Sequence, residues 1–122
     1  MTFNNMTGTW PLAKAGSVRP LAVTSLKRSP TAPDVPAMAE TIKDFDAATW
    51  FGLFVPANTP QPIVDKLAAE VKVILERPEV IEKLKDLGAV AEPAGPETFA
   101  SFIKAERAKW QEVVKAAGVK VE

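Results

Sequence analysis

The sequence predicts an α/β fold with few strands and three C-terminal helices, and two observations carry this prediction. First, the run Thr49–Val55 is apolar and rich in aromatic residues, a composition that favours a strand. Second, apolar residues recur at helical spacing in three successive segments after this run. The chain has 122 residues, enough for one small domain with a single core.

The composition excludes several kinds of site. The chain contains no cysteine and no histidine, which removes disulfides, thiolate chemistry, the commonest metal ligand and the commonest general base. Its 15 basic and 15 acidic side chains cancel, so nothing in the charge indicates a nucleic-acid partner or an acidic membrane surface. The acidic pairs Asp44 with Asp46 and Glu79 with Glu82 are interpreted as solvated groups or helix-dipole partners. We therefore expect no enzyme, no metal and no cofactor.

The N-terminal half predicts two short helices, one strand and a stiff loop. Met6–Ala15 is weakly helical, and Gly16 is its stop signal. Arg19–Ser25 is typical of a buried strand. Lys27–Pro36 is rich in proline and small polar residues, which predicts a stiff loop. Val35–Ile42 has the pattern of a short helix. The first 16 residues lack the basic start and apolar core of a signal peptide, and no stretch of the chain is long enough to predict a membrane-spanning helix.

The central strand is expected to be covered on both sides and to lead directly into a helix. Pro56 ends the strand, because proline cannot donate to a ladder. Thr59 can cap the following helix, and Pro60 suits its first position. The strand presents apolar side chains on both faces, Phe51, Leu53 and Val55 on one and Trp50 and Phe54 on the other.

Three helices are predicted after the central strand. The first spans Pro60–Glu76, the second starts at Pro78 and closes at Gly88, and the third spans Pro96–Ala117. Ala89–Pro93 is a candidate edge strand between the second and third. The last helix carries an apolar stripe that we interpret as core, made of Phe99, Phe102, Ile103, Trp110, Val113, Val114 and Ala117.

Arg107 falls on this stripe, and two interpretations stay open. In the first, its aliphatic stem packs on the helix and its charged head reaches water. In the second, it forms a buried ion pair, which is costly unless the partner is well placed.

Two polar turns are the candidate binding residues. Asn4 and Asn5 follow one possible strand end, and Thr24 and Ser25 end the predicted strand in the N-terminal half. Ligands of α/β sheets bind beyond the carboxyl ends of strands, and amide, hydroxyl and backbone N–H groups there can hold a small anion without catalysis. The same residues are common simply as turn formers. A loose basic cluster that is either a solvated face or an attraction for a carboxylate consists of Lys14, Arg19, Lys27 and Arg28.

The order of motifs resembles the C-terminal part of the solute-binding proteins of tripartite tricarboxylate transporters, also called Bug receptors. The match runs over nearly the whole chain through four stretches, Ala15–Glu40, Thr49–Val71, Arg77–Ala89 and Pro96–Lys120. The resemblance implies two α/β lobes of the periplasmic-binding type (type II), closing on a small carboxylate that passes to a membrane permease. It also implies ligand contacts at Asn4 and Asn5, and at Thr24 and Ser25, with Asn4 standing where the family often has Asp.

Since family members are more than twice this length, the resemblance predicts a partial lobe of a truncated receptor. Residues 1–25 would form the inter-lobe or hinge segment, 26–48 a proline-rich loop with a short helix, and 49–122 the central strand and helices. The family is periplasmic, although no signal peptide is expected in this chain. A different class of function stays open: a non-catalytic interaction module that folds only with a complementary N-terminal half, or as a homo-oligomer through exposed apolar surface.

Overall fold

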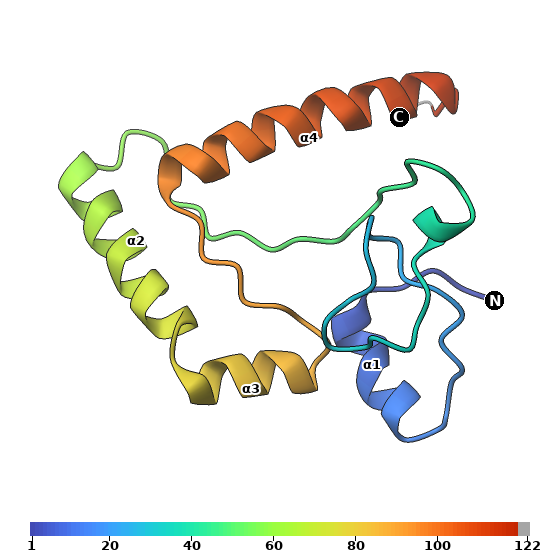
Figure 1. Ribbon diagram of the computed structural model, residues 1–122. Helices are drawn as coiled ribbons and strands as arrows, with labels where there is room; N and C mark the ends of the chain where they lie inside the picture. Colours follow the sequence, from blue (N-terminus) through green and yellow to red (C-terminus); the bar gives the residue numbers. More distant parts are fainter. Residues whose placement is uncertain (120–122) are drawn as a thin grey trace. The chain divides into compact units, whose positions relative to one another are not determined.

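Helices dominate the regular structure of the computed structural model, which describes residues 1–119 (Figure 1). In chain order they are α1 (Met6–Lys14), the 3₁₀-helix η1 (Met38–Glu40), α2 (Gln61–Leu75), α3 (Pro78–Asp86) and α4 (Pro96–Ala116). The four α-helices lie where the sequence predicts them. The chain divides into two units, one made of Met1–Val55 with Ile74–Glu92 and the other of Pro56–Val73 with the chain from Pro93 onward.

Helix α1 ends at Lys14, and Gly16 forms the turn that stops it, as the sequence predicts. Gly16 has a φ of 73°, a left-handed conformation that glycine adopts without steric cost. The N–H of Gly16 donates to the carbonyl of Ala13 at 3.0 Å, and the N–H of Ser17 donates to that of Leu12 at 2.9 Å. This turn satisfies carbonyls that the helix end would otherwise leave without partners.

The predicted strand Arg19–Ser25 is reduced to one isolated parallel bridge, between Val23 and Ala37. The N–H of Val23 donates to the carbonyl of Pro36 at 2.9 Å, and the N–H of Met38 donates to the carbonyl of Val23 at 2.9 Å. The bridge stops here because η1 begins at Met38 and turns the partner segment away.

The other two predicted strands are also absent from residues 1–119. Thr49–Val55 and Ala89–Pro93 belong to no ladder in this part of the chain. A parallel strand takes its hydrogen bonds from neighbouring strands, and the described residues place no strand beside either segment. The strands of the α/β prediction are therefore not confirmed in this structure, and neither is the prediction that the later helices pack on a covered central strand.

Three buried apolar residues of the first unit lie in the proline-rich loop or directly after it. Ala32 and Ala37 are each 2% exposed and Val35 is 8% exposed. The short helix predicted over Val35–Ile42 is only the single turn of η1. Ala37 is extended, with φ −84° and ψ 141°, so the helical turn begins only at Met38. The carboxylate of Glu40 accepts the backbone N–H of Ala37 at 2.9 Å.

A charged pair closes this loop. Arg28 donates from Nε to Oε1 of Glu40 and from Nη2 to Oε2, both at 2.7 Å. Its third nitrogen, Nη1, donates to the carbonyl of Pro33 at 3.2 Å. The hydrogen bond from Arg28, and then that from the backbone N–H of Ala37, lower the pKa of Glu40 from 4.5 to about 2. The fork geometry of guanidinium on carboxylate orients both side chains.

Acid should therefore weaken this loop. The pKa of Glu40 is lower in the folded chain than in the unfolded chain. The ionised carboxylate therefore stabilises the folded chain fully above pH 4.5, and this stabilisation disappears as the pH falls toward about 2. The variant Glu40→Gln should lack this component, so its stability should lie below that of the parent above pH 4.5 and approach it in acid. Thermal melts across this pH range measure the difference. Equal curves for the two proteins would show that the ion pair does not stabilise the loop. Both side chains are partly exposed, and exposed ion pairs often contribute little to stability.

The start of α2 differs from its prediction, since the helix begins at Gln61 rather than at Pro60. Thr59 does not cap the helix: its hydroxyl donates to the carbonyl of Pro56 at 2.8 Å. The carbonyl of Pro60 accepts the first helical N–H groups, from Ile63 at 2.9 Å and Val64 at 3.3 Å. Asn58, with a φ of 66°, completes the turn, because asparagine tolerates this conformation better than most residues.

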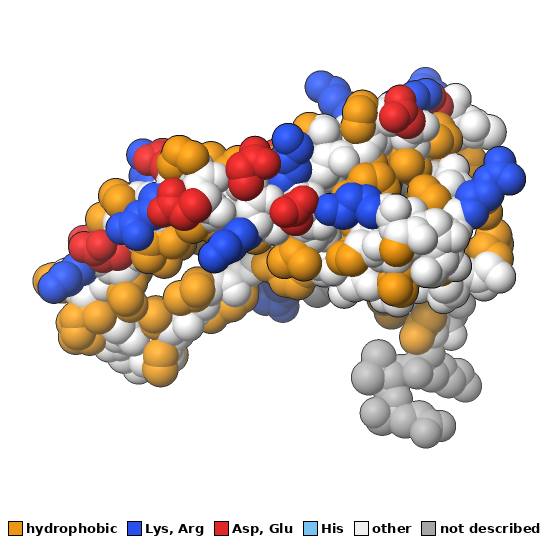
Figure 2. Space-filling model, turned by 90° about the horizontal axis from the view of Figure 1, so that it is seen from below, with side chains coloured by type: hydrophobic (Ala, Val, Ile, Leu, Met, Phe, Trp, Pro, Cys, Tyr) orange, Lys and Arg blue, Asp and Glu red, His pale blue; other side chains and the backbone are white. Residues whose placement is uncertain are grey.

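Large apolar side chains stand at the surface of the described chain, as the space-filling view shows (Figure 2). The stripe of α4 interpreted as core is only partly covered: Phe99 and Ile103 are half-buried, whereas Trp110 is 39% and Val113 is 46% exposed. Arg107 is exposed and forms no ion pair with residues 1–119, which agrees with the first interpretation given for it. Among the described residues, no helix is long and apolar enough to span a membrane.

Candidate functional site

Asn4 and Asn5 form an exposed turn immediately before α1. The backbone N–H of Asn5 donates to Oδ1 of Asn4 at 2.8 Å. The carbonyl of Asn5 accepts the hydroxyl of Thr9 at 2.9 Å and the N–H of Gly8 at 3.1 Å. Asn5 occupies the N-cap position of α1, but its side chain makes no capping hydrogen bond. The local helix start therefore leaves this side chain available for other partners.

Thr24 and Ser25 form the second predicted turn and are half-buried. The hydroxyl of Thr24 donates to the carbonyl of Ala47 at 3.0 Å, and the N–H of Ala47 donates back to the carbonyl of Thr24 at 2.8 Å. The hydroxyl of Ser25 donates to the carbonyl of Lys27 at 2.7 Å. Thr24 is thus fixed to a segment 23 residues further along the chain, while Ser25 stabilises its own turn.

The segment Ala47–Thr49 connects the two predicted turns. Ala47 pairs with Thr24, and the hydroxyl of Thr49 donates to Oδ1 of Asn5 at 3.1 Å. All of these residues belong to the first unit. No hydrogen bond within residues 1–119 joins the two turns directly, so the structure brings them together only through this third segment.

The sequence reasoning missed this connecting segment. Thr49 is predicted only as the first residue of the central strand, and the sequence assigns Ala47 no role. Thr49 offered one signal, because it is a polar residue at the head of a purely apolar run. Ala47 offered none, since it contributes only its backbone groups.

The hydrogen-bonding groups that remain are neutral donors. Oδ1 of Asn4 and Oδ1 of Asn5 each accept a hydrogen bond, while the Nδ2 amide of each side chain has no partner within residues 1–119. Such amides can hold a carboxylate oxygen, and they carry no proton-transfer chemistry at ordinary pH. The described residues contain no group of three His, Cys, Asp or Glu placed to hold a metal ion. The arrangement is suited to binding an anion.

The basic cluster does not converge on these turns. Arg28 is occupied by Glu40, and Nζ of Lys14 pairs with Oδ1 of Asp86 at 3.0 Å. Two of the four cations thus face carboxylates of the same chain, which weakens the prediction that the cluster attracts a carboxylate ligand. The pair on α1 instead connects that helix to the end of α3.

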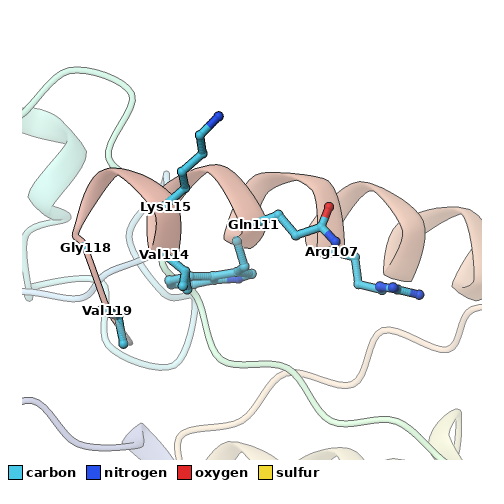
Figure 3. Close-up of a pocket in the computed structure, with 7 residues that line it drawn as sticks. Arg107, Gln111, Val114, Lys115, Gly118 and Val119 are labelled. Atoms are coloured by element: carbon cyan, nitrogen blue, oxygen red, sulfur yellow. The ribbon is translucent and has the colours of Figure 1, made fainter. Parts of the chain in front are cut away.

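A separate hollow of about 640 Å³ lies along the C-terminal part of α4 in the second unit. Its lining consists of Arg107, Trp110, Gln111, Val114, Lys115, Gly118 and Val119. Figure 3 shows the ammonium end of Lys115 pointing away from Val114 and Val119. The indole N–H of Trp110 is already donated to Oε2 of Glu106 at 3.0 Å, and Glu106 also pairs with Lys109. Because the charged groups do not converge, this hollow is not a site for a small anion.

Comparison with protein families gives one match across the chain. The model of the tripartite tricarboxylate transporter family receptor matches residues 2–119. A UPF0065 protein of Pseudomonas knackmussii is 34% identical over 116 residues, which are 93% of this chain and 69% of that protein. Protein BugT of Bordetella pertussis is 32% identical over 119 residues, 97% of this chain and 36% of BugT. A UPF0065 protein of Pseudomonas sp. is 40% identical over 102 residues, 82% of this chain and 30% of that protein.

Solved structures agree with these sequence matches. A protein of R. palustris with adipate has a TM-score of 0.85 at 35% identity, over 94% of this chain and 39% of that one. The periplasmic binding protein BugD has a TM-score of 0.82 at 39% identity, over 93% of this chain and 39% of BugD. MatC from Rhodopseudomonas palustris with bound malate has a TM-score of 0.77 at 34% identity. The chain thus spans well under half of these structures.

Proposed function

We propose that this chain, which belongs to the tripartite tricarboxylate transporter receptor family, supplies one of the ligand-gripping parts of a solute-binding protein for a small carboxylate. The observation that carries the proposal is the convergence of the two polar turns on Ala47–Thr49, through Thr24 on one side and Asn5 on the other. Family membership and solved relatives with adipate and malate support a carboxylate as the ligand.

In this proposal the amides of Asn4 and Asn5 donate to a carboxylate oxygen, and Thr24 and Ser25 shape the opposite turn. The ligand is held by neutral amide donors. Closure of two lobes about a hinge would enclose the ligand, with residues 1–25 acting near the hinge. The receptor would work in the periplasm and deliver the carboxylate to a membrane permease without catalysing a reaction.

Thr24→Val should weaken carboxylate binding by about fivefold, because it removes the hydrogen bond that fixes the turn to Ala47, and such a bond contributes about 1 kcal/mol. Calorimetric titration of the 122-residue chain with adipate, malate and citrate measures the dissociation constants. Asn5→Ala should have a similar effect through the lost amide donor.

Thr41→Val is the matched control, since Thr41 is exposed and its hydroxyl has no partner within residues 1–119. It should leave the dissociation constant unchanged. Equal weakening by Thr24→Val and Thr41→Val, or no binding of any carboxylate while the chain is folded, would contradict the proposed site.

A second candidate function is supported by the exposed apolar side chains: an interaction module that folds or works with the rest of a receptor. Phe51 and Leu53 are both 70% exposed, and the chain corresponds to 39% of two solved relatives. A ligand that binds the folded chain raises its melting temperature by mass action. No thermal shift with any carboxylate, combined with stable association with a receptor polypeptide, would favour the module over an autonomous receptor.

A further inference from the structure

Thr49 contacts the first binding turn from a distant part of the chain, and we propose that it is the positioning residue that presents the Asn5 amide to the ligand. Its hydroxyl donates to Oδ1 of Asn5 at 3.1 Å, across a separation of 44 residues. Because Thr49 holds the oxygen, the Nδ2 donor is the end of the amide that is free to meet a ligand. The inference rests on the proposed function for the ligand itself, whereas the orientation of Asn5 can be measured without one.

A second partner competes for the same oxygen. Asn5 occupies the N-cap position of α1, where a side-chain oxygen commonly accepts the backbone N–H of the second or third helical residue. In α1 these two residues are Thr7 and Gly8. The side chain of Asn5 makes no such capping hydrogen bond, and its oxygen is paired with Thr49 instead. Asn5 therefore has two alternative orientations, and Thr49 holds it in the one that does not cap the helix.

Both residues of this contact stand on anchored backbone. The carbonyl of Asn5 accepts the hydroxyl of Thr9 at 2.9 Å. On the other side, Ala47 lies two residues before Thr49 and exchanges two hydrogen bonds with Thr24. Thr49 is also β-branched, which restricts rotation about its χ1. Although both residues are exposed, the contact between them can therefore favour one orientation of the amide.

The same pattern at Asn4 indicates which ligand atoms fit. Oδ1 of Asn4 accepts the backbone N–H of Asn5 at 2.8 Å. Both amides thus have an engaged oxygen, and the Nδ2 group of each has no partner within residues 1–119. An ionised carboxylate only accepts hydrogen bonds, whereas an ammonium group only donates them. The two amides therefore favour the carboxylate end of a ligand and disfavour an ammonium group at this turn.

Thr49→Val tests the positioning role, because it removes the hydroxyl and keeps the branched shape. It should weaken binding of adipate, malate or citrate by about threefold to fivefold in calorimetric titration, the effect of one hydrogen bond. Thr49→Ser keeps the hydroxyl and should stay within about twofold of the parent. Thr9→Val is the matched control, since it removes a hydrogen bond to the backbone carbonyl of Asn5 and not to its amide. It should also stay within about twofold of the parent.

Variants of Asn5 show whether Thr49 acts through this amide. Asn5→Ala and the double variant Asn5→Ala/Thr49→Val should bind carboxylates equally, because the group that Thr49 positions is missing from both. Asn5→Asp should bind at least about fivefold more weakly than Asn5→Ala, because its second oxygen places a negative charge beside the carboxylate ligand. A further loss in the double variant would overturn the positioning role. Equal or tighter binding by Asn5→Asp would overturn the preference for a carboxylate at this turn.

NMR of the free chain measures the orientation of Asn5 directly. In Thr49→Val the released oxygen should cap α1, so the side-chain amide signals of Asn5 should shift. The backbone amide of Thr7 or Gly8 should exchange with solvent at least about threefold more slowly than in the parent. Since α1 gains a cap as the contact is lost, the melting temperature should fall by no more than about 2 °C. Thr49→Ser should match the parent in all three measurements.

Thr49→Val with unchanged Asn5 amide signals and unchanged exchange at the start of α1 would overturn the inference. A lower melting temperature at full affinity would also overturn it, because Thr49 would then have a purely structural role. The proposed carboxylate site fails separately. Slower exchange at the start of α1 in Thr49→Val, together with no binding of adipate, malate or citrate by the parent chain, would retain the orientation of Asn5 and refute the binding function.

Discussion

Gly88→Ala should lower the free energy of unfolding by about 2–5 kcal/mol. Gly88 follows the end of α3 with a φ of 79°, and a Cβ built there would lie 2.8 Å from Cβ of Trp10 and 2.9 Å from Cγ of Met6. The left-handed conformation alone costs an L-residue about 1–2 kcal/mol. The collision adds about 1–3 kcal/mol, because Cβ of Trp10 is held by the backbone of α1 and cannot rotate away. Urea denaturation followed by circular dichroism measures the loss.

Two other glycines separate these contributions. Gly16 has a φ of 73° with no atom within 4 Å of a built Cβ, so Gly16→Ala should cost only the conformational part, about 1–2 kcal/mol. Gly8 lies inside α1 in open space and without positive φ, so Gly8→Ala should stabilise the chain by about 0.5–1 kcal/mol. If Gly88→Ala were no more harmful than Gly16→Ala, the close packing of α3 on α1 would be refuted.

The positions of the helices could be predicted because their signals are local. Proline stands at the first position of α3 and of α4, and glycine with positive φ follows the ends of α1 and α3. Each signal acts through the backbone of a few neighbouring residues and needs no distant partner. The prediction for α2 was wrong at its start: the helix begins at Gln61 rather than Pro60, and the hydroxyl of Thr59 donates to Pro56 instead of capping the helix.

The strands could not be predicted in the same way, because a strand is defined by its neighbour. The apolar run Thr49–Val55 has the composition of a strand, but composition says nothing about whether the described chain supplies a partner. The bridge between Val23 and Ala37 shows the difference. The predicted strand Arg19–Ser25 forms only this one bridge, and the pairing stops where η1 begins.

The candidate site was predictable in its residue types and not in its geometry. Asn5 and Thr24 are polar turn residues, and the structure anchors both to one segment. At Ala47 this segment contributes only its backbone N–H and carbonyl groups. Almost every residue type carries these groups, so the sequence could not single out Ala47. The ligand roles of Asn4, Asn5, Thr24 and Ser25 remain predictions, as does the division of the chain at residues 25 and 48.

Ala37→Leu should lower the free energy of unfolding by about 1–3 kcal/mol, the usual effect of overpacking. Ala37 is 2% exposed and stands where three interactions of the first unit meet. It forms the parallel bridge with Val23, its N–H donates to Glu40, and Glu40 is held by Arg28. A larger side chain cannot enter without moving one of these partners. Thermal unfolding of the 122-residue chain measures the change.

The same substitution tests whether the loop supports the binding turn. Val23 precedes Thr24, so displacement of the bridge should also weaken the pairing of Thr24 with Ala47 and, with it, carboxylate binding. Ala48→Leu is the control, because Ala48 is exposed, and it should change stability by no more than about 0.5 kcal/mol. If Ala37→Leu lowered stability without changing affinity, the loop would hold the first unit together without positioning Thr24. If it changed neither, the packing of the loop around Ala37 would be refuted.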